Sequence, residues 1–534
     1  MLDIRSISSS DLKSLSPSEL AEAAAQMLLL IEAQTKRIDT QAQGIKWRDA
    51  KIASVVFQLA RLKAWRYGAK TESMNAEQRD IFEETFAADH ASLEAQLELL
   101  RGKQTPDSAA GAEAPEQKRQ QPKREPLPAH LPRVEQRIEP DNTHCPQPEC
   151  GKQMVRVGED ISERLDVVPA QFFVQRQIRG KWACKCCQVL VQEPAAPQVF
   201  DNALPTPALQ AYVVVNRFVD HIPYYRQEQA NARGGVHTPR STLAAWGGQT
   251  GVQLMPLCDA HREFVLGSRV LHADETPISM LDPGAGKTKK TYMWAYARGA
   301  FEPEPGVVFD FCLGRGGKYP FEFLKGWKGT LVVDAYSGYD RALTLEGRHT
   351  AYCVAHVRRK FDEVFKANAS PVAAEAIQRI AWLYKVEAEA KTFSSESRLR
   401  LRQEQSKPMW DALHVWLKLE RARVPDGSAI AKAIDYALNQ WIGLGRFLLD
   451  GDVPIDNNYV ENRIRPWALG RRNWLFIGSQ LAGERAAVVM SLLQSAKLNG
   501  HEPWAYLTDV LTRLPTQLNS RIEELLPHRW KPAS

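Results

Sequence analysis

Two stretches decide the fold of this chain: SRVLHADET at residues 268–276 and TLVVDAYSGY at residues 330–339. Each is an apolar-rich run that leads into an acid, Asp274 in the first and Asp334 in the second. Such runs predict buried strands. Because open α/β sheets bind ligands just beyond the ends of their strands, we expect the two acids to mark a functional edge of the sheet.

The residues around these stretches predict a mixed sheet. Residues 291–299 and 306–314 are rich in β-branched and aromatic residues, so they form a three-stranded meander with the first stretch. A short helical pattern at 319–327 precedes the second stretch, and residues 349–357 resemble a further strand that runs into a helix. The order predicts a mixed α/β domain.

A third acid lies far along the chain. The segment IDNNYVENRIRPWALGRRNWLFIGS at 455–479 offers Asp456 or Asn457 as a helix cap, a helical stretch through Glu461, and Pro466 as a stop. Between the second and third acids, about 90 residues follow a mostly helical pattern. We interpret these residues as an insertion within the catalytic domain.

Three carboxylates at one place would require a divalent cation. Asp274, Asp334 and Glu461 would repel one another, and hard oxygen ligands suit Mg²⁺ or Mn²⁺. Two such ions about 4 Å apart activate a water or sugar hydroxyl and stabilise the leaving oxygen of a phosphodiester. From spacing alone the alternative stays open that these are ordinary acids at strand ends.

A cysteine cluster predicts a second, structural metal. Cys145 and Cys150 form one knuckle, and Cys184 and Cys187 form a C-x-x-C knuckle after a gap, with Cys186 as a spare. Four thiolates in this arrangement bind Zn²⁺ in a closed site that stabilises a fold. The alternative is a set of free thiols.

The N-terminal region resembles an arm followed by a linker. Isoleucine or leucine recurs every seven residues from Ile31 to Leu59, the period of a coiled coil. The partner positions are polar at first, so the region is either a self-association arm or a helix packed on the body. Six prolines with basic residues at 106–132 indicate a linker that either contacts phosphate or is simply solvated.

Residues 205–262 predict helices on either side of the glycine turn Gly234-Gly235. They form either a helix-turn-helix that brings Arg240 and Ser241 near DNA or a helical support for the next domain.

The motifs HADETP, VVDAYSGY, CVAHVRRKF, the segment at 455–479 and SLLQSAKLNGHEPWAYL closely resemble the transposases of the insertion-sequence-66 family. The resemblance spans nearly the whole chain. It implies a ribonuclease-H-like catalytic core with a D-D-E triad and a helical insertion. By match of motif, the triad is Asp274, Asp334 and Glu461.

Residues near the triad motifs are candidates for contact with DNA. His356 lies either near the metals or scissile phosphate or in the fold as a satisfied histidine. The basic and aromatic residues suit phosphate contact and base stacking, although a solvated charged face is the alternative. These residues are Arg358, Arg359, Lys360, Arg471, Arg472 and Trp474.

We divide the chain into seven regions on these grounds. They are a helical or coiled-coil arm (1–100), a linker (101–139), a zinc-binding domain (140–192), a helical region (193–264), a ribonuclease-H-like catalytic domain (265–366 and 456–485), a helical insertion (367–455) and a C-terminal helical region (486–534).

Composition and charge limit the classes of protein and the cellular compartments that are compatible with this chain. The 534 residues carry 69 Lys and Arg against 63 Asp and Glu, and a net charge of +6 does not by itself indicate a nucleic-acid partner. No run approaches the roughly 18 apolar residues of a membrane span, and the first residues lack the apolar core of a secretory signal. Eight cysteines in such a chain indicate a reducing cytoplasm. The resemblance to the family implies in addition a bacterial, nucleoid-associated protein.

The resemblance implies an enzyme that cuts transposon ends and joins them to target DNA with Mg²⁺ or Mn²⁺. Its expected partners are the terminal repeats, target DNA, further copies of the chain and accessory proteins of the same element. Two alternatives remain: a structure-selective nuclease with the same core, and a catalytically silent zinc-dependent DNA-binding protein.

Overall fold

The computed structural model describes residues 34–36, 38, 41–42, 44–46, 48–60, 62, 76–101, 127, 131–147, 149–168, 171–195, 197–198, 204–282, 287–474 and 476–532. The chain divides into two compact units, 1–70 with 93–116 and 71–92 with 117–534. No described helix has the length and apolar character that crossing a bilayer requires.

In the first unit, residues 48–60 are helical. Val55 and Leu59 are buried, whereas Ile38 and Ile45 are exposed. Self-association through this arm remains a prediction. Of the expected linker, residues 102–126 lie outside the described residues.

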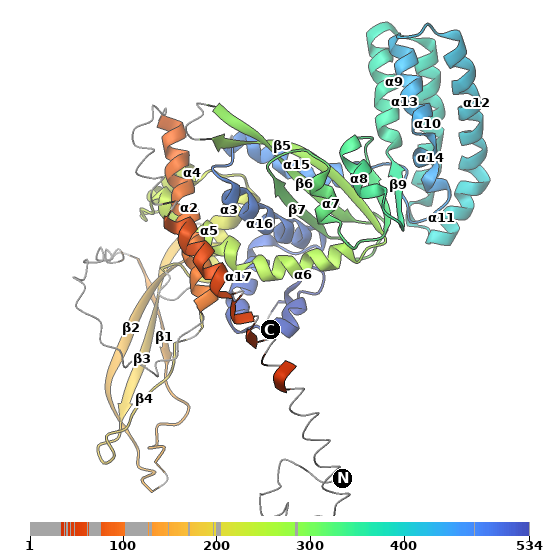
Figure 1. Ribbon diagram of the computed structural model, residues 1–534. Helices are drawn as coiled ribbons and strands as arrows, with labels where there is room; N and C mark the ends of the chain where they lie inside the picture. The colour runs from red at the N-terminus through yellow and green to blue at the C-terminus, as the bar shows by residue number, and fades with distance from the viewer. Residues whose placement is uncertain are drawn as a thin grey trace, which may run out of the picture. The chain divides into compact units, whose positions relative to one another are not determined.

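The second unit contains a five-stranded mixed sheet with the order β7-β6-β5-β8-β9 (Figure 1). Its antiparallel part pairs β6 with β5 and β7, and its parallel part pairs β8 with β5 and β9. The mixed sheet predicted from the sequence is therefore confirmed. The strands are β5 (Val270–Asp282), β6 (Lys287–Arg298), β7 (Val307–Cys312), β8 (Gly329–Val333) and β9 (Arg348–Tyr352).

The prediction that the first strand ends at Asp274 and Glu275 is wrong. β5 continues to Asp282 because β6 pairs with it from Leu271 onward, up to the pair Asp282 and Lys287. Pairing with β8, by contrast, stops at His272. Asp274 therefore lies inside a strand, just beyond the point where that strand loses its parallel neighbour.

One face of the sheet is covered by α15 (Asn458–Trp474). Val460, Ile464 and Trp467 of this helix share a buried cluster with Met293 and Ala295 of β6. On β5, residues with even numbers point to this face, as Ile278 of the same cluster indicates.

The edge strand β7 is closed by α16 (Gln480–Leu498). The backbone N–H groups of Val307 and Phe309 donate to the hydroxyl oxygens of Ser495 and Ser491, at 3.0 and 2.8 Å. These bonds satisfy donors that an open sheet edge would leave unpaired. The boundary placed at 485/486 cuts through α16, so the C-terminal region is part of the sheet's packing.

The predicted insertion is a helical bundle, in which α9, α10, α12 and α13 run side by side (Figure 1). Its core includes Phe361 and Val364 of α9 together with Leu383 and Ile434. The bundle therefore begins in α9, before residue 367. Its helices are α9 (Val354–Asn368), α10 (Pro371–Glu389), α11 (Ser395–Leu401), α12 (Lys407–Arg423), α13 (Ala429–Asn439) and α14 (Trp441–Leu444).

The cysteine region forms a separate sheet. β3 (Gln171–Ala183) pairs with β1 (Arg133–Ile138), β2 (Val155–Val168) and β4 (Leu190–Gln192). β1 falls within the range 101–139 that we interpreted as a linker, so that boundary is wrong at its C-terminal end. The strand forms because its backbone pairs in parallel with β3, a long-range contact that local composition does not reveal.

Four helices connect the two sheets in sequence: α3 (Pro207–Phe218), α4 (Tyr224–Arg233), α5 (Arg240–Gln253) and α6 (Met255–Leu266). Leu209 of α3 and Leu243 of α5 pack with Leu165 and Val174 of the cysteine sheet. In α5, eight of the fourteen residues are buried, and the others are only partly exposed. No residue of this helix is exposed, so it cannot enter a DNA groove along its length and the supporting alternative is favoured; Arg240, in its first turn, is partly exposed.

Candidate active site and zinc centre

The pairing of β5 with β8 brings the first two acids to the same level. The parallel register matches Val270 with Thr330 and His272 with Val332. Continued by two residues, this register sets Asp274 level with Asp334, which directly follows β8. Matched residues of parallel strands point to the same face, so both acids lie on the side covered by α15.

Asn457 fixes α15, and with it the third acid, to this part of the sheet. Its side-chain Oδ1 lies 2.8 Å from His272 Nδ1, and its Nδ2 donates to the carbonyl of Ala273 at 2.9 Å. Its backbone carbonyl accepts the N–H of Glu461 at 3.3 Å. One buried amide thus connects the strand of Asp274 with the first turn that carries Glu461.

The pKa of Asp274 responds to the charges of the other acids near it. The pKa of Asp274 is raised to about 8, chiefly by burial and also by the neighbouring charges of Glu275, Asp334 and Glu461, against a backbone hydrogen bond that lowers it. Three acids from three distant segments are therefore electrostatic neighbours.

Glu275 is engaged elsewhere, as its opposite orientation on the strand predicts. Its side chain is only 1% exposed. It accepts hydrogen bonds from Arg315 Nε at 2.7 Å and from the Tyr339 hydroxyl at 2.8 Å. Arg315 also lies over the ring of Tyr336, 3.7 Å from its centroid. Sequence reasoning missed Arg315, because this residue lies in a glycine-rich loop after β7 without a motif of its own.

Among the other predicted residues, two lie close to the third acid. His356 Nε2 is 3.7 Å from Glu461 Oε1, and Arg359 Nη2 is 3.6 Å from Glu461 Oε2. Arg358 and Lys360 are exposed on the same helix, α9. The segment CVAHVRRKF therefore brings a histidine and an arginine to Glu461.

The segment after Glu461 departs from the prediction at Pro466, which does not stop the helix. α15 continues through it to Trp474. Proline in a helix interior costs about 3 kcal/mol. Trp467 and Trp474 follow Pro466 in the same helix, and both are buried in the core. Burial of their rings therefore offsets the cost of the proline.

The basic and aromatic residues of α15 divide into two kinds. Arg471 donates to the carbonyl of Pro277 at 2.8 Å and so ties the helix to β5. Trp474 is 8% exposed and meets Trp467 edge-on, which leaves no ring face for stacking on a base. Arg472 is exposed and stays a candidate for phosphate contact.

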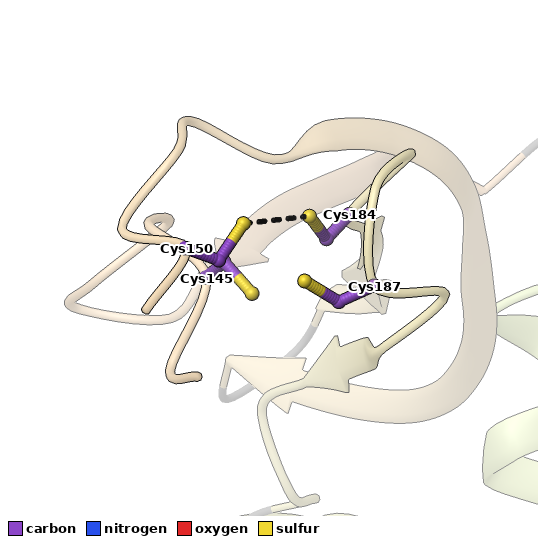
Figure 2. A group of neighbouring side chains, drawn as sticks. All are labelled: Cys145, Cys150, Cys184 and Cys187. Carbon is purple, nitrogen blue, oxygen red and sulfur yellow. Dashed lines mark hydrogen bonds between the residues drawn. The ribbon is translucent and has the colours of Figure 1, made fainter. Parts of the chain in front are cut away.

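The four predicted cysteines come together (Figure 2). The sulfurs of Cys145, Cys150, Cys184 and Cys187 all lie within 4.8 Å of one another. The Sγ atoms of Cys150 and Cys184 are 3.7 Å apart, close to the edge of about 3.8 Å that a zinc–sulfur tetrahedron requires. The spare Cys186 is exposed and accepts from Lys152 Nζ instead.

Backbone hydrogen bonds in this cluster favour the thiolate form of Cys184. The N–H groups of Cys187 and Cys186 lower the pKa of Cys184 to about 6. The pKa of Cys187 is instead raised to about 12, chiefly by its hydrogen bond with Cys150. Four close sulfur donors with one favoured thiolate fit a Zn²⁺ ion, which promotes loss of the remaining protons.

Comparison with known families finds matches over most of the chain. A model described as "Transposase IS66 family" matches residues 202–485, more than half of the chain, and the "IS66 C-terminal element" matches 491–528. A "zinc-finger binding domain of transposase IS66" matches 142–188, and "Transposase C of IS166 homeodomain" matches 56–135. The chain belongs to the IS66 transposase family.

Two similar proteins come from Sinorhizobium fredii. Uncharacterized protein y4qI is 36% identical over 534 residues, with 96% of this chain and 93% of that protein covered. Uncharacterized protein y4jD is 38% identical over 421 residues, with 76% and 81% covered. The likeness to y4qI therefore extends over almost the full length of both chains.

Proposed function

We propose that this chain is a DNA transposase whose five-stranded sheet forms a ribonuclease-H-like core with the catalytic triad Asp274, Asp334 and Glu461. The observation that carries the proposal is the geometry at β5: its register with β8 sets Asp274 level with Asp334, and the hydrogen bond from Asn457 to Ala273 holds the first turn of α15, with Glu461, beside them. The strand order and the family membership support it.

The triad suits Mg²⁺ or Mn²⁺ because every donor is a carboxylate oxygen. Glu461 Oε1 is buried without a hydrogen-bond partner among the described residues, as expected for an atom that awaits a ligand. When bound there, the ions supply Lewis-acid stabilisation of the attacking and leaving oxygens of a phosphodiester.

The residues beside the triad orient the DNA. Arg359 lies 3.6 Å from Glu461 Oε2 and has a half-exposed side chain, so it is positioned to meet a phosphate that approaches the acids. Arg358, Lys360 and Arg472 extend the same basic contact. The zinc domain would hold the terminal repeat.

Two displacements follow on this account. Water attacks the phosphodiester at the transposon end and releases a 3′-hydroxyl; that hydroxyl then attacks a phosphodiester of the target, whose own 3′-oxygen leaves. No covalent bond to the protein is needed. Because the two ends must be processed together, we expect more than one copy of the chain to act.

The test incubates the protein and Mg²⁺ with pre-cut transposon ends and a target plasmid. Joined products are expected from the unaltered chain and from Glu346→Gln, a control acid exposed on the surface. Asp334→Asn should join at least about a hundredfold less. Hydrolysis without joining would indicate a nuclease, and unchanged joining by Asp334→Asn would refute the triad.

A further inference from the structure

A second group of metal-ligating side chains lies beside the triad. Cys353, His356 and Glu461 each offer one ligand atom, and these atoms lie within 4.8 Å of one another. Cys353 immediately precedes α9, His356 lies in its first turn, and Glu461 lies in the first turn of α15. Two helix starts therefore converge on one point.

The polar atoms of this group are poorly satisfied within the protein. His356 Nδ1 and Glu461 Oε1 are buried, and neither has a hydrogen-bond partner among the described residues. Buried polar atoms without partners are costly, so each such atom needs an explanation. A bound cation would satisfy the carboxylate, and it would satisfy His356 Nδ1 if that nitrogen, rather than Nε2, coordinates the ion.

The thiol is already oriented for a metal. Cys353 is 2% exposed, and its Sγ accepts the backbone N–H of Asn457 at 3.2 Å. An N–H donor to sulfur is the kind of outer contact that fixes a metal-bound thiolate. The same Asn457 holds α15 in place through its side chain, so the thiol and Glu461 are positioned by one residue.

We propose that Cys353, His356 and Glu461 form a Zn²⁺ site distinct in chemistry from the all-oxygen triad. Sulfur, imidazole nitrogen and carboxylate oxygen are all zinc ligands, whereas Mg²⁺ takes oxygen ligands. Three protein ligands leave the fourth position open to water. The Cys353 thiol loses its proton to solvent as the zinc–sulfur bond forms.

This site shares Glu461 with the triad. Zinc bound to Glu461 would withdraw a ligand from the Mg²⁺ site, so added zinc should inhibit the joining reaction. This consequence rests on the proposed function, but zinc binding itself does not.

The first experiment measures zinc bound per chain after equilibration and desalting. The unaltered chain is expected to bind two equivalents, one in the four-cysteine cluster and one here. Cys353→Ala should bind one. Cys258→Ala, which removes another buried thiol, should still bind two. Equal zinc content in the unaltered chain and Cys353→Ala would overturn the proposal.

A second variant tests the same site if Cys353→Ala fails to fold. His356→Gln removes one ligand from a partly exposed position and should weaken zinc binding at this site at least about tenfold. Co²⁺ in place of zinc provides a spectroscopic reading. The difference between the spectra of the unaltered chain and His356→Gln should show tetrahedral bands with one thiolate, and a flat difference would contradict the site.

The inhibition experiment separates this inference from the proposed function. Joining in Mg²⁺ without added zinc tests the transposase, and the loss of joining as zinc is added tests the shared ligand. Cys353→Ala should tolerate at least about tenfold more zinc relative to its own zinc-free rate. Equal zinc sensitivity of both chains would refute the shared ligand while leaving the transposase intact.

Discussion

His261 shows how a single buried side chain makes stability depend on pH. Its Nε2 lies 2.8 Å from Ser495 Oγ and 3.2 Å from the carbonyl of Val307, which joins α6 to α16 and β7. Burial lowers the pKa of His261 to about 3. The folded pKa lies below the ordinary value of about 6.5, so the unfolded chain binds the proton first as pH falls.

We therefore expect His261 to stabilise the fold fully above about pH 6.5 and to lose this contribution, up to about 5 kcal/mol, as pH falls toward 3. Urea unfolding at pH 7 and pH 4.5 measures the change. His261→Gln should lose less stability between these values than the unaltered chain, whereas His349→Gln, at an exposed position, should behave like the unaltered chain. An identical loss in His261→Gln would contradict this account.

At the same scale, the sequence predicts the three acids as a candidate triad because each stands in a motif that resembles those of the family. It did not identify Asn457 as more than a cap, nor Arg315 at all. The role of Asn457 depends on His272 and Ala273, about 185 residues away, which come near only after folding. The sequence predicts that Trp474 stacks on a base, but its ring is buried. A tryptophan beside arginines has the same local pattern whether it is buried or exposed.

At the scale of elements, the contact of α15 with β5 determines the site. Asn457→Ala removes the bonds to His272 and Ala273 while leaving all three acids in the chain. We expect the joining rate at saturating DNA to fall at least about tenfold, with little change in the affinity for transposon ends. Asn457→Asp, which keeps an acceptor for His272, should recover part of the rate.

Asn458→Ala is the matched control, because Asn458 is exposed and bonds only locally to Asp456 in the described structure. It should join at the unaltered rate. If Asn457→Ala lost end binding and joining to the same degree, the residue would be merely structural and the positioning role would be refuted.

The elements themselves were predictable to different degrees. Strands of the mixed sheet and helices of the insertion follow from local patterns, so their types are correct. Their limits depend on partners: β5 is extended by β6, and α15 continues past Pro466 because its tryptophans are buried. β1 exists only through its parallel pairing with β3.

At the scale of the whole molecule, the zinc domain and the catalytic sheet are expected to have separable roles. Cys187→Ala removes one sulfur from the four-cysteine cluster, and we expect it to lower the affinity for transposon ends at least about tenfold. Cys186→Ala should bind like the unaltered chain, since Cys186 lies outside the cluster. A gel-shift titration with end DNA measures both, and equal affinities would contradict a role for the zinc in end binding.

The central claim is that Asp274, Asp334 and Glu461 together bind the divalent ions of the reaction. The most direct measurement is a crystal structure of the protein soaked in Mn²⁺ with zinc withheld from the buffers, examined by anomalous diffraction at the manganese edge. The account predicts anomalous peaks within about 2.2 Å of oxygens from all three carboxylates. Well-ordered acids without any manganese peak between them would contradict it.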